Sequence, residues 1–174
     1  PLLYRDLHAS LNKTLNTTAS GAATDRCWAP TAAASQQPPA PSFRAFAEMF
    51  YSGALSVQQT GDIYTAASCS ACGPRLLVLG SPAIDGSALS SVEGYGLAYG
   101  LLVHDHVERF LLHYFALSAH GYTRGTHTAP ESSNVTDRDQ PTVAYSAAGQ
   151  VAAPTYLKWM LCFEEPEART LWLA

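Results

Sequence analysis

The feature that most constrains the fold is a long apolar stretch, residues 89–120, which leads into a loop that carries His, Tyr, Arg and Glu. Its apolar residues recur at steps of three and four, which is helical spacing, and few polar residues interrupt them. The sequence therefore predicts one long and mostly buried helix over residues 89–120. Gly94, Gly96 and Gly100 near its start would let a neighbouring element approach closely, or would bend the helix.

The loop after this helix is the first candidate for a functional site. Gly121 and Gly125 end the helix, and Pro130 prevents it from resuming at once. The loop carries Tyr122, Arg124, His127 and Glu131. Loops that are fixed at both ends by a rigid scaffold often carry binding and catalytic residues. We expect Arg124 to hold Glu131 in its ionised form through a charge-assisted hydrogen bond.

Composition narrows the class of protein. The 174 residues are enough for one domain with a sizeable core, and 47% of them are hydrophobic while only 14% are charged. Charged residues interrupt the long apolar stretch, so no run reaches the roughly 18 residues needed to cross a bilayer. The net charge is -4 and the basic residues are scattered, which argues against a nucleic-acid partner.

Three sequons and four cysteines favour an extracellular glycoprotein. The sequons begin at Asn12, Asn16 and Asn134, all in polar segments where a glycan would meet solvent. The cysteines are Cys27, Cys69, Cys72 and Cys162, an even number that allows two disulfides in three connectivities. We expect Cys69 and Cys72 each to bridge to Cys27 or Cys162. The alternative is a zinc site at the C-x2-C spacing of Cys69 and Cys72, but zinc sites of this kind usually need a second close pair.

The rest of the chain divides into a lead-in and a helical region. Residues 1–41 are rich in Ala, Thr, Ser and Pro and are predicted to be an irregular lead-in or linker. Residues 42–174 are predicted to form a helical-hairpin domain, with a first helix over 42–58 and a last helix over 154–163. The run at 75–80 is either a short buried strand or a connection. Because its ends are apolar and abrupt, we expect the chain to be a fragment of a larger protein.

Residues with carboxyl side chains are the candidates for catalysis. Cleavage of a glycosidic bond needs one protonated carboxyl group and a second, ionised one a few ångströms away. Glu93 either caps the long helix or takes part in catalysis, and Glu131 is the candidate base or nucleophile. His104, Asp105, Glu108 and Arg109 fall within the predicted helix, where we expect them to pair with one another. No metal or cofactor is expected, since His104 and Glu108 have suitable spacing but lack a third ligand nearby, and no phosphate-binding or dinucleotide-binding motif is present.

Several segments together resemble the C-terminal part of six-hairpin glycosidase-like proteins. They are FYSGAL at 50–55, RLLVLGSPAIDG at 75–86, the block from 93 to 131 and YLKWMLCFEEPEARTLWLA at 156–174, the most specific being YTRGTHTAPE at 122–131. The resemblance implies a mainly α fold in which helical hairpins form part of an (α/α)6 toroid with long irregular loops. It also implies that loops at one end of the toroid line a carbohydrate groove. Glu131 and Glu93 would then be catalytic, while Tyr122, Arg124 and His127 would bind substrate.

Two functions of different classes follow from the sequence. The first is a secreted carbohydrate-active protein, or the remnant of a glycoside hydrolase, with carbohydrate as its partner. The second is a non-catalytic extracellular glycoprotein that acts as a structural or assembly module. Further domains or subunits, self-association included, would complete the fold in either case. Two carboxylates facing each other across an open groove would favour the first function.

Overall fold

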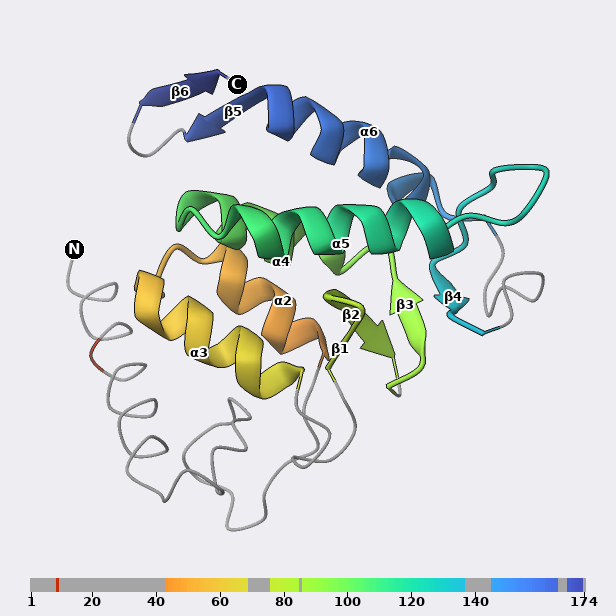
Figure 1. Cartoon of the computed structure of the whole chain (residues 1–174), viewed down its shortest axis with the longest axis horizontal. Helices are drawn as coiled ribbons and strands as arrows, with labels where there is room; N and C mark the ends of the chain where they lie inside the picture. The colour runs from red at the N-terminus through yellow and green to blue at the C-terminus, as the bar shows by residue number, and fades with distance from the viewer. Residues whose placement is uncertain are drawn as a thin grey trace, which may run out of the picture.

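The structure contains both helices and short antiparallel strands. The computed structural model describes residue 9 and residues 43–68, 76–84, 86–136, 145–165 and 169–173. The helices in these residues are α2 (Phe43–Tyr51), α3 (Val57–Ala67), α4 (Gly94–Val103), α5 (Val107–His120) and α6 (Ala147–Leu161). The helices α4 and α5 cross the middle of the molecule, with α2 and α3 on one side and α6 on the other (Figure 1). None of the helices in the described part is long and apolar enough to cross a membrane.

The strands of the described residues form two antiparallel sheets. The first contains, in order, β1 (Leu77–Val78), β2 (Ser81–Ile84), β3 (Ala88–Ser90) and β4 (Ser132–Asn134). The second is a hairpin of β5 (Cys162–Glu165) and β6 (Thr170–Leu173). These sheets show that the prediction of a mainly α fold, a partial (α/α) toroid, is wrong. The strands have two to four residues, too few for a clear alternating pattern, and β3 pairs with β4 across more than forty residues of chain (Ala88 with Asn134).

The first hairpin turns at two residues with positive φ. Val78 pairs with Ser81, so that Leu79 and Gly80 alone form the loop, with φ angles of 51° and 77°. Positive φ at both positions is typical of a type I′ turn, whose twist matches that of the flanking strands. The ambiguous run at 75–80 is therefore a strand followed by a tight turn.

The single helix predicted over 89–120 is divided into β3, α4 and α5. After α4, the N–H of Asp105 donates to the carbonyl of Leu102 and the N–H of His106 donates to the carbonyl of Leu101. Asp105 has a φ of 57°. These features form a Schellman motif, in which Asp105 takes the left-handed position that glycine usually occupies. The apolar spacing continues through this break, which is why the sequence pattern conceals it.

The predicted helix over 42–58 also ends early. It stops at Tyr51, and α3 begins again at a capping box, in which the Ser56 side chain accepts from the N–H of Gln59 and the Gln59 side chain accepts from the N–H of Ser56. The S-x-x-Q spacing is a known signal for a helix start.

The last helix is longer than predicted. It starts after Ser146, whose side chain accepts from the N–H of Gly149, and Pro154 lies inside it. The prediction placed Pro154 in the first turn, where proline is common, but the alanine-rich residues before it are also helical. Residues 1–41, predicted as a lead-in, lie outside the described residues except for residue 9.

The closest packing in the fold is between α2 and α4. A Cβ atom on Gly96 would overlap the carbonyl oxygen of Ala47, and one on Gly100 would lie 2.6 Å from the carbonyl oxygen of Phe50. The two glycines, one turn apart, therefore let the backbones of the two helices meet. The prediction that glycines in this region allow close approach is confirmed.

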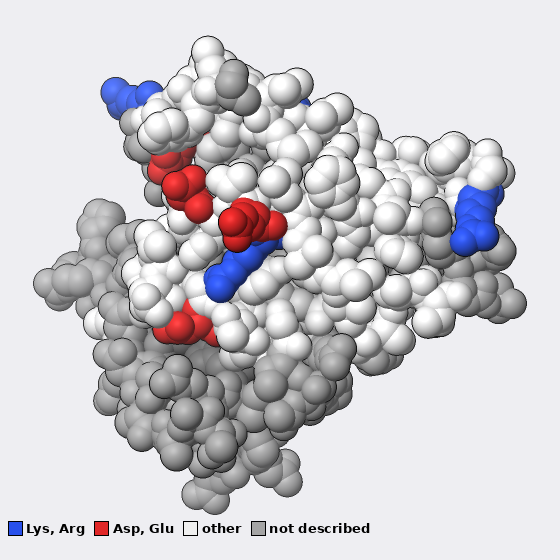
Figure 2. Space-filling view, in the orientation of Figure 1, with Lys and Arg blue, Asp and Glu red and all other residues white. Residues whose placement is uncertain are grey.

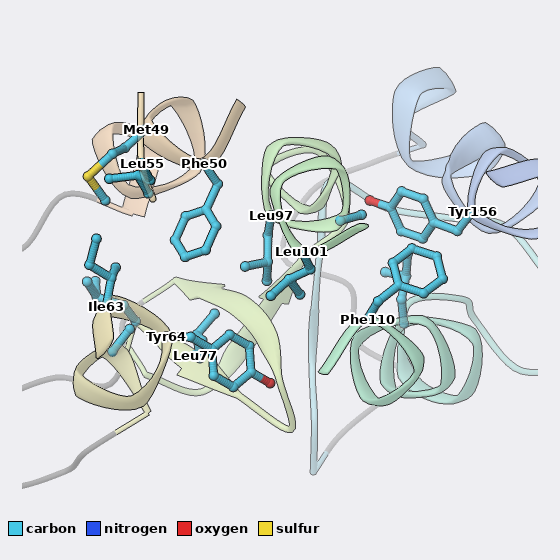
Figure 3. Packing of buried hydrophobic residues seen from close by; sticks show 14 of the residues in the cluster. Met49, Phe50, Leu55, Ile63, Tyr64, Leu77, Leu97, Leu101, Phe110 and Tyr156 are labelled. Atoms are coloured by element: carbon cyan, nitrogen blue, oxygen red, sulfur yellow. The ribbon is translucent and has the colours of Figure 1, made fainter. Parts of the chain in front are cut away.

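The apolar core spreads from this contact. Leu97 and Leu101 of α4 are completely buried. Figure 3 shows them between Phe50 on one side and Phe110 and Tyr156 on the other. The helix α4 thus joins α2 to α5 and α6 in one core.

A polar cluster is buried beneath α4. The Oγ of Ser81 and the Nδ1 of His113 are 2.7 Å apart, and both side chains are fully buried. A Cβ on Gly94 would lie 2.9 Å from the Nε2 of His113 and 2.6 Å from the hydroxyl of Tyr156. Burial lowers the pKa of His113 to about 4, while a hydrogen bond with the Gly94 backbone acts in the opposite direction. A serine beside a histidine can form a nucleophile and its base, but here no substrate reaches either group.

We expect Gly96→Ala to destabilise the protein strongly, because the new methyl group meets backbone atoms that cannot move aside. The free energy of unfolding should fall by about 3 kcal/mol, measured by urea denaturation. Gly61→Ala is the matched control, since its Cβ would meet only side-chain atoms, the end of Arg109 at 3.2 Å and the ring of His106 at 3.7 Å. That change should be neutral or stabilising by up to about 1 kcal/mol. Equal losses in the two variants would contradict the contact between α2 and α4.

Acid should weaken the fold through His113. Because its pKa of about 4 in the folded protein lies below the value of 6.5 expected for the unfolded chain, the unfolded state binds more protons between these pH values. The free energy of unfolding should be constant above about pH 7 and fall by roughly 3 kcal/mol as the pH drops to about 4.

Denaturation of the wild type and of His113→Gln across this range tests the prediction. The variant is less stable at neutral pH. Its free energy of unfolding should fall much less on acidification than that of the wild type. His104→Gln is the control, because burial also lowers the pKa of His104 but that side chain is only partly buried. A decrease of equal size in the wild type and in His113→Gln would show that other groups cause it.

Candidate functional site

An open cleft lies beside the contact between α2 and α4. Its volume is about 360 Å³, and the described residues that line it are Ala47, Glu48, Tyr51, Val92, Glu93, Tyr95 and Gly96. The α2 helix supplies the first three, and the start of α4 with the turn before it supplies the others. The glycine contact fixes the position of one wall against the other.

Glu93 and Tyr95 form the α4 wall. Glu93 stands at the N-cap position of α4 but makes no capping hydrogen bond through its side chain. The positive end of the helix dipole lies there, which favours negative charge nearby. The hydroxyl of Tyr95 donates to the carbonyl of Ala148 at 2.7 Å, and its ring packs edge-on against Tyr156. Tyr95 is therefore held in place by α6.

Glu48 and Tyr51 form the α2 wall. They are three residues apart in a helix and so lie on the same face. Tyr51 is 58% exposed, and its ring contacts that of Tyr99 with 5.0 Å between centroids. The cleft thus offers a tyrosine and a carboxylate on each wall. Such a set can accept hydrogen bonds from hydroxyl or amine groups and can pack against the flat face of a ligand.

Part of the loop predicted as a sugar-binding surface packs against α6. The hydroxyl of Tyr122 donates to the carbonyl of Gly149 and accepts from the N–H of Ala153, both at 3.3 Å. Burial raises the pKa of Tyr122, and the hydrogen bond with Ala153 acts in the opposite direction. Gln150 also donates to the carbonyl of His127 and accepts from the N–H of Ala129.

The described contacts do not include the predicted bond between Arg124 and Glu131. Arg124 and His127 are exposed and Glu131 is partly buried. The carbonyl of Glu131, not its carboxylate, accepts bonds from the N–H and the hydroxyl of Ser91. Glu93 lies in the cleft between α2 and α4, and Glu131 is not among the residues that line it.

The charged residues around the break between α4 and α5 do not pair as predicted. Arg109 donates to the carbonyl of Gly61 at 3.2 Å and lies over the ring of Tyr64. The described residues include no ion pair between Arg109 and Asp105 or Glu108. The prediction missed α3, which supplies these partners. Among the described residues, no three His, Cys, Asp or Glu side chains are grouped closely enough to hold a metal ion.

The structure describes one of the three sequons and one of the four cysteines. Asn134 is partly exposed at the end of β4, and its side-chain oxygen accepts from the N–H and the hydroxyl of Thr136. The thiol of Cys162 is free. The remaining residues, Asn12, Asn16, Cys27, Cys69 and Cys72, lie outside the described residues, so their glycosylation and disulfide pairing stay predictions.

Sequence reasoning missed the α2 half of the cleft. Glu48 and Tyr51 belong to the helix predicted over 42–58, in which no functional residue is predicted. The available signal was the pair Gly96 and Gly100, which indicates where another helix approaches. That spacing marks the face of contact but does not identify the partner helix.

Comparisons of the chain with protein-family models, with curated proteins and with solved structures found no match.

Removing charge from Arg124 and Glu131 should leave stability almost unchanged, because the structure shows no bond between their side chains. We expect Arg124→Ala and Glu131→Gln each to change the free energy of unfolding by less than about 0.5 kcal/mol. The double variant should equal the sum of the two, so that the coupling energy is close to zero. A coupling energy of about 1 kcal/mol or more, measured by urea denaturation, would show that Arg124 and Glu131 form the ion pair that the sequence predicts.

Proposed function

We propose that the chain is the carbohydrate-binding part of a secreted glycoprotein, and that sugar binds in the cleft between α2 and α4. The observation that carries the proposal is the lining of this cleft, where Glu48 and Glu93 stand beside Tyr51 and Tyr95. Its volume of about 360 Å³ is at the small end of the range for ligand sites and suits one or two sugar rings.

The chemistry of the lining matches a sugar on two counts. The carboxylates of Glu48 and Glu93 accept hydrogen bonds from hydroxyl groups, and bonds to a charged acceptor are the stronger ones. The exposed ring of Tyr51 offers an apolar face for the C–H side of a sugar ring. Tyr95 is fixed by Ala148, so its ring needs no ordering when a ligand binds.

Binding is the function that we propose for these residues. Hydrolysis would use the same two carboxylates, but it also requires one of them to remain protonated near neutral pH. The resemblance to glycosidase-like proteins adds an expectation of activity for Glu93, and the binding experiment below includes a test for it.

Secretion and glycosylation are part of the same proposal. The bonds between Asn134 and Thr136 use the oxygen of the side-chain amide, so they do not engage the nitrogen that would carry a glycan. Asn134 is also partly exposed at the end of a strand, where a bulky modification meets solvent.

A second function, an assembly module, is favoured by a different observation. Large hydrophobic side chains are more than half exposed on α6 and β6, among them Leu161 at 62% and Leu173 at 73%. Exposed apolar side chains that gather on one face mark a site of interaction with another protein. This function and sugar binding use different surfaces and are compatible.

Variants of the cleft should lose sugar binding. The wild-type chain would first be applied to an array of defined oligosaccharides, and the sugar that binds would then be titrated calorimetrically. We expect Tyr51→Ala to weaken binding about tenfold, or about 1.4 kcal/mol, through loss of the stacking face. Glu93→Gln and Glu48→Gln should each weaken it by about tenfold or more, because each loses a charged acceptor.

Glu131→Gln is the matched control, since it removes a carboxylate outside the cleft. The same samples would be assayed for release of reducing sugar, and loss of that release in Glu93→Gln with binding retained would extend the proposal to hydrolysis. Failure of the wild type to bind any sugar on the array, or equal binding by wild type and Tyr51→Ala, would refute the cleft as a carbohydrate site.

A further inference from the structure

One turn of α6 departs from the regular pattern of backbone hydrogen bonds. In an α-helix the N–H of each residue donates to the carbonyl four residues earlier. Between Gly149 and Ala153, however, the hydroxyl of Tyr122 lies 3.3 Å from both groups, donating to the carbonyl and accepting from the N–H. The next N–H is missing because residue 154 is proline, so the carbonyl of Gln150 lacks the donor four residues on. Two successive backbone bonds are therefore altered at one place.

The residue after the proline adds a third departure. The hydroxyl of Thr155 donates to the carbonyl of Val151 at 2.8 Å, a type of side-chain bond that often bends helices. A proline inside a helix and a side chain inserted between its backbone groups are established causes of a kink. We call residues 149–153 the opened turn.

The two parts of α6 that meet at the opened turn have different anchors. The start of the helix is attached to the loop after α5, because the Gln150 side chain accepts from the N–H of Ala129 and donates to the carbonyl of His127. The rest of the helix packs into the core. Its Tyr156 is fully buried, and Trp159 stacks on Tyr156 with 5.7 Å between ring centroids.

Tyr95, on the α4 wall of the cleft, contacts both parts of α6. Its hydroxyl donates to the carbonyl of Ala148, which precedes the opened turn. Its ring meets those of Tyr156 and Trp159, which follow the opened turn, edge-on. The position of Tyr95 therefore depends on how the two parts of α6 are placed relative to each other.

The contacts at the opened turn involve only uncharged groups. Figure 2 shows the charged side chains of one face gathered toward its left and right edges, with a mostly uncharged surface between them, where α5 and α6 lie. Salt screens interactions between charges. The arrangement of Tyr122 and α6 should therefore not respond to ionic strength.

We propose that Tyr122 is a positioning residue for the cleft, which acts on Tyr95 through the opened turn. Its hydroxyl holds the carbonyl of Gly149, and the preceding carbonyl, that of Ala148, is the one that accepts from Tyr95. Tyr122 is not among the described residues that line the cleft, so it acts without touching a ligand there. The consequence for sugar binding rests on the proposed function, whereas the position of Tyr95 does not.

NMR of the full chain with isotope-labelled tyrosine tests the position of Tyr95 without any ligand. The resonance of this ring is identified by its absence from Tyr95→Phe. In Tyr122→Phe the N–H of Ala153 is free to bond directly to the carbonyl of Gly149. The opened turn should then close, the carbonyl of Ala148 should move with it, and the Tyr95 resonance should shift.

Two further variants separate this effect from general loss of a hydroxyl group. Pro154→Ala supplies the missing N–H while it retains Tyr122, and it should also shift the Tyr95 resonance, because it makes the helix regular from the other side of the opened turn. Tyr64→Phe is the matched control, since the hydroxyl of Tyr64 is buried and has no hydrogen-bond partner among the described residues. It should leave the Tyr95 resonance in place.

The second arm uses the sugar identified on the array. Tyr122→Phe and Tyr95→Phe should each weaken binding about fivefold, because the ring of Tyr95 must then be ordered when the sugar binds. The double variant should bind no more weakly than either single variant, since both changes interrupt the same connection. Tyr64→Phe should bind as the wild type does.

The outcomes distinguish this proposal from the proposed function. An unchanged Tyr95 resonance in Tyr122→Phe, shown by circular dichroism to be folded, overturns the positioning role, and Pro154→Ala decides in the same way if Tyr122→Phe does not fold. Losses of affinity that multiply in the double variant also overturn it. A wild type that binds no sugar refutes only the proposed function, because the Tyr95 resonance still decides the role of Tyr122.

Discussion

The contact between the backbones of α2 and α4 organises the structure. Gly96 and Gly100 present no side chains, so the carbonyl groups of Ala47 and Phe50 lie directly against α4. The approach carries Phe50 into the core beside Leu97, and it places the polar side of α2 next to the start of α4. The cleft is therefore a product of helix packing, and its walls come from segments that are more than forty residues apart in the chain (Glu48 and Glu93).

The helix α6 supports the proposed sugar site from its inner side. On its inner side, α6 holds Tyr95 through the carbonyl of Ala148 and anchors the loop around Tyr122. On its outer side α6 exposes Leu157 and Leu161, so the residues that position Tyr95 and those that meet solvent lie on different faces of one helix.

The local features of the fold were predictable where one segment contains the whole signal. The helical spacing around Leu97 and Leu117 was correct, and so was the close approach at Gly96 and Gly100. The sequence also contained the Ser56 capping box, which was overlooked. By contrast, the pairing of β3 with β4 depends on tertiary contact, and Asp105 adopts a left-handed conformation without a glycine to mark it. The left-handed Asp105 divides the predicted helix, and the pairing of β3 with β4 forms part of a sheet that the predicted toroid lacks. The same distinction applies to the candidate cleft. Glu93 could be singled out from the sequence because it stands at a helix start, whereas Glu48 comes next to it only when α2 packs against α4.

The two sides of α4 differ in what sets the spacing to their neighbours. Toward α2 the distance is fixed by backbone atoms, which cannot rotate away. Toward α6 it is fixed by rings, with Tyr95 and Tyr99 meeting Trp159 edge-on. Ring contacts of this kind tolerate small tilts and slides at little cost. One side of α4 is therefore spaced by backbone atoms and the other by side chains, and the bond from Tyr95 to Ala148 couples the α4 wall of the cleft to the position of α6.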